Sequence, residues 1–263
     1  MPILEYLFPL VVPFALVLSR VVGLFMFTPL LSSTTVPRTY KAFFSAALAV
    51  AVFPRVLQTG AAAAYLADVP TIGMVMFSEL LIGVIMGLIA GLPIVALQMG
   101  GYIMGYQMGL SLAQAYNPEM EGSDDVVSQL LFFMGITAYI AAGGLDLVYV
   151  SMLSSFEHVP VGGFVASDVP LDLYVGLLTS GLELAIRVAA PVMGIILMAL
   201  LAMGFIMKTM PQINILSVGF AAKIMAGLFV LTISAGVIEV VLRDEMLSML
   251  QALLTWVESL GRG

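Results

Sequence analysis

The chain has 263 residues, of which 62% are hydrophobic and 10% are charged, and its formal net charge is −7. A soluble globular domain carries about a quarter charged residues, so this composition excludes a soluble domain and predicts an all-α, polytopic helical membrane protein. The chain has no cysteine, which excludes disulfides and thiolate metal sites, and its nine Lys and Arg residues form no basic stripe for nucleic acid.

Six apolar segments follow one another along the chain, and we expect them to form a single integral membrane domain over residues 1–263. They lie at about 7–32, 40–58, 71–105, 126–153, 172–207 and 213–241. A helix crosses the hydrocarbon with about 20 residues, whereas the third and fifth segments have about 35 each. These two segments are therefore too long for simple spans.

Both long segments contain a proline near the middle, Pro93 in the third and Pro191 in the fifth. Proline removes a backbone hydrogen bond and kinks or breaks a helix. We therefore expect bent or broken helices arranged as long hairpins. Two ordinary helices that overshoot the membrane are the alternative.

Seven charged residues within the apolar segments bear on what surrounds the helices: Arg20, Glu79, Asp146, Glu183, Arg187, Lys223 and Glu239. Each would cost a few kcal/mol, roughly 2.5–3.5, if it faced lipid at mid-depth. Glu183 and Arg187 are four residues apart with the acid first, which predicts a helical ion pair. The whole set indicates helices that are enclosed by protein rather than by lipid.

Glycines recur at every fourth residue on both sides of Pro93. One set is Gly83, Gly87 and Gly91, and the other is Gly101, Gly105 and Gly109. This spacing puts each set on one helix face without side chains, which predicts close helix packing. Chance in a glycine-rich chain is the alternative, and the spacing does not say whether the neighbouring helix belongs to this chain.

The longest polar stretch is "GYQMGLSLAQAYNPEMEGSDDVV", residues 105–127. Asn117-Pro118 predicts a turn, and four carboxylates follow it, at Glu119, Glu121, Asp124 and Asp125. Their spacing fits no hard-cation site, because such sites need alternating oxygen ligands around a tight glycine turn. The residues themselves leave open a solvated acidic loop and a flexible plug bordered by methionines.

No pattern in the chain predicts an enzyme, a cofactor or a metal site. The single histidine, His158, lies beside Pro160 at the end of a segment, and no G-x-S-x-G, P-loop or dinucleotide motif occurs. The C-terminal stretch, about 239–260, predicts an amphipathic helix that packs on protein, because its polar face is net acidic. Its apolar stripe consists of Leu242, Met246, Met249, Leu250, Leu253, Val257 and Leu260.

A seam between two apolar runs, "KTMPQINILSVGFAAK", resembles the most recognisable block of the FliR family of flagellar export-gate membrane proteins and their virulence type III secretion relatives. The matching positions are Lys208, Pro211, Gln212, Asn214, Gly219 and Lys223. Two further blocks are similar, one through Arg20, Gly23, Pro29, Pro37, Lys41 and Pro54, the other through Ser155, Phe156, Pro160 and Gly162. The chain departs from the family at Lys208, at Asn117 and at Leu145-Asp146, where the family usually has Arg, Asp and a Gly-His pair.

The resemblance implies a non-enzymatic, pore-forming subunit of the type III export gate in the bacterial inner membrane, at the flagellar basal body. It would join FliP and FliQ in a hetero-oligomer, contact FlhB and FlhA, and pass unfolded flagellar proteins. A secondary small-molecule transporter and the equivalent virulence subunit are the alternatives.

The resemblance also assigns residues to two roles. It places the family's channel plug in the loop of residues 105–125, here Met108, Gly109, Leu110, Gln114, Asn117, Pro118, Glu119 and Met120. Residues expected to pack against sister subunits are Lys208, Pro211, Gln212, Asn214, Gly219, Lys223 and Arg20. Polar groups from 208 to 214 would form a hairpin tip whose amides and ammonium are satisfied by those subunits.

Overall fold

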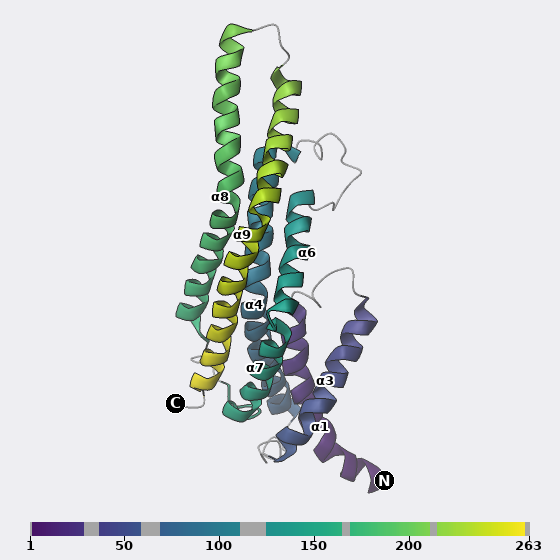
Figure 1. Cartoon of the computed structure of the whole chain (residues 1–263). Coiled ribbons are helices and arrows are strands. Elements are labelled where there is room, and N and C mark those ends of the chain that lie inside the picture. The colour runs from purple at the N-terminus through teal and green to yellow at the C-terminus, as the bar shows by residue number, and fades with distance from the viewer. Residues whose placement is uncertain are drawn as a thin grey trace. The chain divides into compact units, whose positions relative to one another are not determined.

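The computed structural model of the chain describes residues 2–28, 37–58, 69–110, 125–164, 169–210 and 215–260. These ranges contain seven helices and no strand (Figure 1), which confirms the all-α prediction. The helices are α1 (Pro2–Phe27), α3 (Arg38–Gln58), α4 (Val69–Met108), α6 (Val126–Ala141), α7 (Gly144–His158), α8 (Leu171–Thr209) and α9 (Ile215–Ser259). Several predicted site residues lie outside the described ranges: Gln114, Asn117, Pro118, Glu119 and Met120 of the plug, and Pro211, Gln212 and Asn214 of the hairpin tip.

Five of the described helices are long and apolar enough to cross a membrane, namely α1, α3, α4, α8 and α9. Together, α6 and α7 meet the same test as one broken span, which brings the number to six. The prediction of a polytopic helical membrane protein with about six apolar segments is therefore confirmed.

Two helices remain unbroken at the prolines where we expected a bend or a break. Pro93 lies inside the 40-residue helix α4, and Pro191 lies inside the 39-residue helix α8. The structure therefore contradicts a break at these two places, while a bend at either proline stays a prediction. A proline removes one backbone hydrogen bond, whereas leaving the helix in apolar surroundings would strip many more backbone groups of their partners.

The break occurs instead between α6 and α7, inside the apolar segment predicted at 126–153. The N–H of Ala142 closes α6 by donating to the carbonyl of Ala138 at 2.8 Å. Gly143 then adopts a left-handed conformation with φ of +74°, which a glycine adopts without steric cost. Conversely, the last apolar segment and the amphipathic stretch after it form one uninterrupted helix, α9, of 45 residues.

The chain folds as two compact units. Unit 1 comprises Met1–Leu92, Gly143–Leu177 and Leu247–Gly263, and unit 2 comprises Pro93–Ala142 and Leu178–Met246. The boundary within α4 falls at Pro93.

In unit 1, α1 packs against both α3 and the first half of α4. Phe14 and Phe53 form an edge-to-face aromatic pair between α1 and α3, with ring centroids 5.4 Å apart. Between α1 and α4 the backbones approach closely, because Gly83 of α4 faces the backbone of Arg20 and Gly87 faces that of Leu24. A Cβ atom on either glycine would collide with these backbone atoms.

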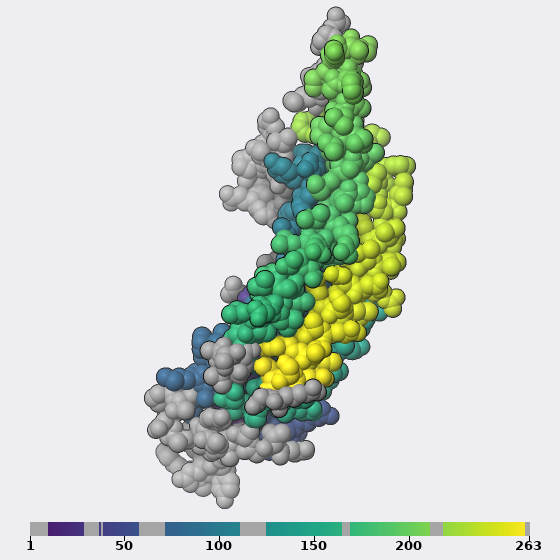
Figure 2. All heavy atoms as spheres, turned by 90° about the vertical axis from the view of Figure 1, so that its left-hand side faces the viewer, coloured from purple at the N-terminus to yellow at the C-terminus, as the bar shows by residue number. Residues whose placement is uncertain are grey.

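In unit 2, α8 and α9 run side by side as a long hairpin (Figures 1 and 2). The second half of α4 contacts α6, α8 and α9. The contact to α6 is made at Gly101, where a Cβ atom would lie 2.5 Å from the Cα of Ser128. The candidate span in α4 is 67% buried, whereas that in α8 is only 11% buried. The described residues therefore leave most of α8 uncovered.

Candidate functional site

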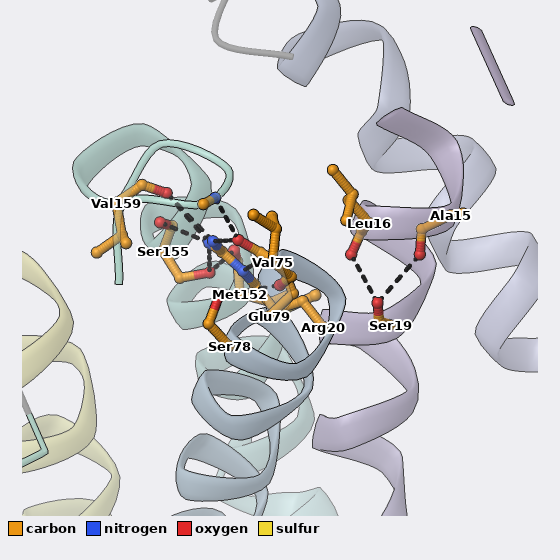
Figure 3. Close-up of polar contacts among 11 residues, drawn as sticks. Ala15, Leu16, Ser19, Arg20, Val75, Ser78, Glu79, Met152, Ser155 and Val159 are labelled. Carbon is orange, nitrogen blue, oxygen red and sulfur yellow. Dashed lines mark hydrogen bonds and ion pairs between the residues drawn. The ribbon is translucent and has the colours of Figure 1, made fainter. Parts of the chain in front are cut away.

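A fully buried ion pair joins α1 and α4 in unit 1. The guanidinium of Arg20 donates to both carboxylate oxygens of Glu79, from Nε to Oε2 at 2.6 Å and from Nη2 to Oε1 at 3.0 Å. Both side chains are fully buried. Figure 3 shows the two groups facing one another, with a bidentate geometry that is typical of strong Arg–carboxylate pairs.

The end of α7 and the turn after it satisfy the remaining polar atoms of this pair. Nη1 of Arg20 donates to the carbonyl of Ser155 at 2.9 Å, and both terminal nitrogens reach the carbonyl of Val159 at 3.3 Å (Figure 3). The N–H of Gly162 donates to Oε1 of Glu79 at 2.7 Å, and the ring of Phe156 lies 4.2 Å from Cζ of Arg20. The pair thus fastens α1, α4 and the α7 end together.

This geometry corrects the role we expected for Arg20. It was predicted to pack against a sister subunit, but it is buried inside unit 1 and bonds to its own chain. The physical reason is Glu79, which lies 59 residues later and supplies the opposite charge. Two blocks of the family resemblance, one with Arg20 and the other with Ser155, Phe156 and Gly162, therefore meet at one polar centre.

The first part of the predicted plug lies against α9 in unit 2. Met108 is buried against Gly227, where a Cβ atom would lie 2.5 Å from the Met108 Cε. Gly109 ends α4 in a left-handed conformation, with φ of +87°, and a Cβ there would lie 2.6 Å from Cε1 of Phe220. Both the backbone conformation and the space require glycine. Leu110, the next residue, is half-buried.

The residue that follows the undescribed part of this connection is equally well anchored. Asp125 caps α6, and its Oδ1 accepts a hydrogen bond from the N–H of Val127 at 3.3 Å. Its buried carboxylate occupies the space that a Cβ on Gly105 of α4 would need. Burial raises the pKa of Asp125, and the hydrogen bond from Val127 opposes this shift without overcoming it.

Three of the residues expected to contact sister subunits lie on the α8–α9 hairpin. Lys208 is exposed near the end of α8, and Gly219 is buried beside Met203, where a Cβ would lie 2.8 Å from the sulfur. The Nζ of Lys223 lies 5.0 Å from the centroid of the Phe220 ring, a cation–π contact. Phe220 thus contacts Gly109 through one part of its ring while Lys223 lies over its face.

The glycines predicted to pack on α4 lie at close contacts or are buried. At four of them a neighbouring helix or its cap leaves no room for a side chain: Gly83, Gly87, Gly101 and Gly105. The fifth, Gly91, is buried within α4. Glu183 and Arg187 form an exposed ion pair at 3.7 Å. In the part of the chain that the structure describes, no three His, Cys, Asp or Glu side chains converge as a metal site would require.

Sequence reasoning missed three contributors to these sites. Glu79 was noted only as one of seven charges in apolar segments, with nothing to single it out as the partner of Arg20. Phe220 carries no local signal. Asp125, by contrast, stands directly before an apolar helical run, which is a pattern typical of a helix N-cap.

Comparison with known proteins places this sequence among bacterial export proteins. The sequence model of the family "Bacterial export proteins, family 1" matches residues 11–249. The flagellar biosynthetic protein FliR of Caulobacter vibrioides is 29% identical over 234 residues, covering 88% of this chain and 91% of the relative. FliR of Bacillus subtilis is 27% identical over 235 residues, covering 88% and 89%, respectively.

A relative from another system is also similar. The Yop proteins translocation protein T of Yersinia pestis is 23% identical over 214 residues, covering 80% of each chain. The resemblance to the FliR family is thereby confirmed. Because the family match spans residues 11–249, the chain belongs to the bacterial export proteins, family 1.

Proposed function

We propose that this chain is a structural, pore-forming subunit of the flagellar type III protein export gate, assembling with FliP and FliQ in the bacterial inner membrane to pass unfolded flagellar proteins. The family match over residues 11–249 carries this proposal. Two flagellar relatives, at 27% and 29% identity, are more similar to the chain than the Yop translocation relative at 23%. FliR of Escherichia coli is also 23% identical. The two more similar relatives favour the flagellar system over a virulence system.

The uncovered faces of unit 2 support an assembly with other proteins. Large apolar side chains are exposed along the hairpin, among them Phe205 on α8 and Phe229 on α9. The same helices carry exposed charges within their candidate spans, at Glu183, Arg187 and Glu239. Lipid would cover the apolar groups but not the charges, so sister subunits are the better cover for these faces.

A secondary transporter would need polar groups available to a substrate between its helices. The buried polar centre of unit 1 does not offer them, because the donors of Arg20 and the carboxylate of Glu79 are engaged by the chain itself. This closed network is what a structural subunit needs in order to hold its helices together.

We also propose that the loop of Met108, Gly109, Leu110, Gln114, Asn117, Pro118, Glu119 and Met120 plugs the export channel, and that Lys208, Pro211, Gln212 and Asn214 form a hairpin tip against sister subunits. The anchored ends support the plug, since Met108 and Gly109 are held by α9 and Asp125 by α4. FlhB and FlhA are the proposed further partners, outside the pore itself.

The test of assembly is to purify the tagged chain alone and after co-expression with FliP and FliQ, followed by native mass spectrometry. We expect the chain alone to aggregate or dissociate, and the co-expressed chain to appear in one large hetero-oligomer. A well-behaved monomer that captures neither protein and binds a small solute would support a transporter instead.

A separate experiment tests the plug. Deletion of residues 110–122 should leave the hetero-oligomer intact but raise the ion conductance of membranes that contain it. The intact complex is the control. An unchanged conductance would remove the plug assignment and leave the assembly proposal standing.

A further inference from the structure

Helix α6 forms one wall of an open groove in unit 2. The groove has a volume of about 720 Å³ and is lined by one face of α6, from Val126 to Ala141, and by Glu239 of α9. The face is mostly apolar, with Gln129 and Thr137 as its polar residues. It is uncovered, with Leu130 at 44% and Phe133 at 59% exposure. The described part of the chain leaves this groove unfilled.

The lining residues of α6 follow helical spacing. Val126, Leu130, Phe133, Thr137 and Ala141 are separated by three or four residues, so they form one continuous ridge. The 16 residues of α6 give this ridge a length of about 24 Å. A ridge of this kind packs well into the grooves between the side-chain rows of another helix.

One charged residue, Glu239, lines this groove, and it forms no ion pair with any described residue. Glu239 is exposed, and α6 itself contains no charged residue. No ion pair to Glu239 occurs among the residues that the structure describes, although Arg243 lies one turn along α9. A carboxylate that becomes covered by an apolar partner needs a cation from that partner.

We propose that this groove binds an apolar helix of a sister subunit that carries a lysine or arginine, and that this cation pairs with Glu239. The inference rests on the proposed function, because it specifies the chemistry of one partner in the assembly. A lipid acyl chain fits the apolar face but brings no positive charge to Glu239. Charge complementarity therefore favours the helix over an acyl chain.

Charge reversal tests the pairing in the full chain co-expressed with FliP and FliQ. Glu239→Lys should lower the amount of sister subunit recovered per tagged chain by about tenfold or more, because it places two cations together. Glu239→Gln should lower it less. The matched control is Asp244→Lys, an exposed carboxylate on the same helix that does not line the groove, and it should leave recovery unchanged.

The variants must be compared at equal amounts of chain in the membrane, so that loss of folding is not counted as loss of binding. Changing the lysine or arginine of the sister helix to glutamate should restore recovery with Glu239→Lys. If Glu239→Lys assembles as well as the unmodified chain, the pairing is wrong. If the unmodified chain itself recruits neither FliP nor FliQ, the proposed function fails instead.

Cross-linking identifies the occupant directly, because the chain has no cysteine and any introduced cysteine is unique. Thr137→Cys lies in the groove, and Thr232→Cys is its control on α9 outside the groove. The two threonines are well matched, since both are exposed and each hydroxyl donates at 2.8 Å to the carbonyl four residues earlier.

A photo-activatable maleimide on Thr137→Cys should form a cross-link to an apolar helix of FliP or FliQ in the assembled complex. Reaction at Thr232→Cys shows that the reagent reaches and labels the complex. A cross-link from Thr137→Cys to lipid alone, in a complex that still contains FliP and FliQ, would overturn the inference while leaving the proposed function intact.

Discussion

Glu79 in unit 1 and Asp125 in unit 2 are both buried carboxylates, but only Glu79 is paired with a cation. Arg20 and the N–H of Gly162 together donate three hydrogen bonds to Glu79. Asp125 accepts one, from the N–H of Val127, and its burial raises its pKa. In an apolar protein, a buried acid thus either has its counter-charge provided by the fold or tends to retain its proton.

The largest expected loss of stability comes from removing the ion pair between Arg20 and Glu79. Glu79→Ala leaves the buried guanidinium of Arg20 without its counter-charge, which should lower the free energy of unfolding by about 3–5 kcal/mol. Denaturant unfolding in detergent micelles measures this loss. The control is Glu183→Ala, which removes an exposed partner of Arg187 and should cost less than about 1 kcal/mol. Equal losses for the two variants would contradict the role assigned to Glu79.

Glycine substitutions sharpen the comparison, because each buried carboxylate lies near a close-packed glycine of α4. Gly83→Ala drives a Cβ atom into the backbone of Arg20, whereas Gly105→Ala meets only the side chain of Asp125. We expect Gly83→Ala to lower the free energy of unfolding by about 1–3 kcal/mol and Gly105→Ala by less, because a side chain can rotate away.

Gly73→Ala is the matched control for both substitutions. It lies on the same helix, and a Cβ atom there has no neighbour within 4 Å. The thermal stability of the Gly73→Ala variant should equal or slightly exceed that of the unmodified chain, since alanine favours the helix. If the Gly83→Ala variant is as stable as the Gly73→Ala variant, then α1 and α4 can move apart without loss of stability, and the close contact at Gly83 is not needed.

The smallest expected effect is a pH dependence at Asp125. Its carboxyl ionises near its usual pKa of 3.8 when the chain is unfolded and at a higher pKa when it is folded. Between these two pKa values the folded chain holds more protons, so the free energy of unfolding falls as the pH rises through that window. Asp125→Asn keeps an acceptor for the N–H of Val127 but cannot ionise, so this dependence should disappear.

Unfolding curves of the unmodified chain and of Asp125→Asn, recorded from acid to neutral pH, measure the difference. Parallel profiles would mean that Asp125 ionises equally in both states. The absolute stabilities matter less here than the slope with pH.

Periodic features of this fold could be predicted from the sequence, because burial leaves a regular pattern. The apolar spans agree with the helices, and the stripe of the C-terminal stretch is buried at Leu242, Met246, Leu253 and Val257. The break between α6 and α7 also had a local signal, the pair Gly143-Gly144. Pro93 and Pro191 are weaker signals of a break, because one proline removes only one hydrogen bond.

Long-range pairings could not be predicted in the same way. Arg20 meets Glu79 and Ser155, which lie 59 and 135 residues further along the chain, and no spacing rule connects such positions. In the sequence, the seven charges within apolar segments look alike. Only the folded structure distinguishes the buried pair of Arg20 and Glu79 from exposed charges such as Asp146 and Glu239. The helices could therefore be predicted from the sequence, whereas the polar centre could not, because it depends on tertiary geometry.

Helix α9 has no loop between Ile215 and Ser259 that could absorb a change of length. Inserting a single residue near its middle would turn everything that follows by about 100°. Leu253 and Val257 would then point to a different side of the rod. Insertions and deletions in α9 should consequently be tolerated only when their length returns the following side chains to the same side of the helix. The number of residues in α9 is therefore itself a constraint on how the sequences of such chains diverge.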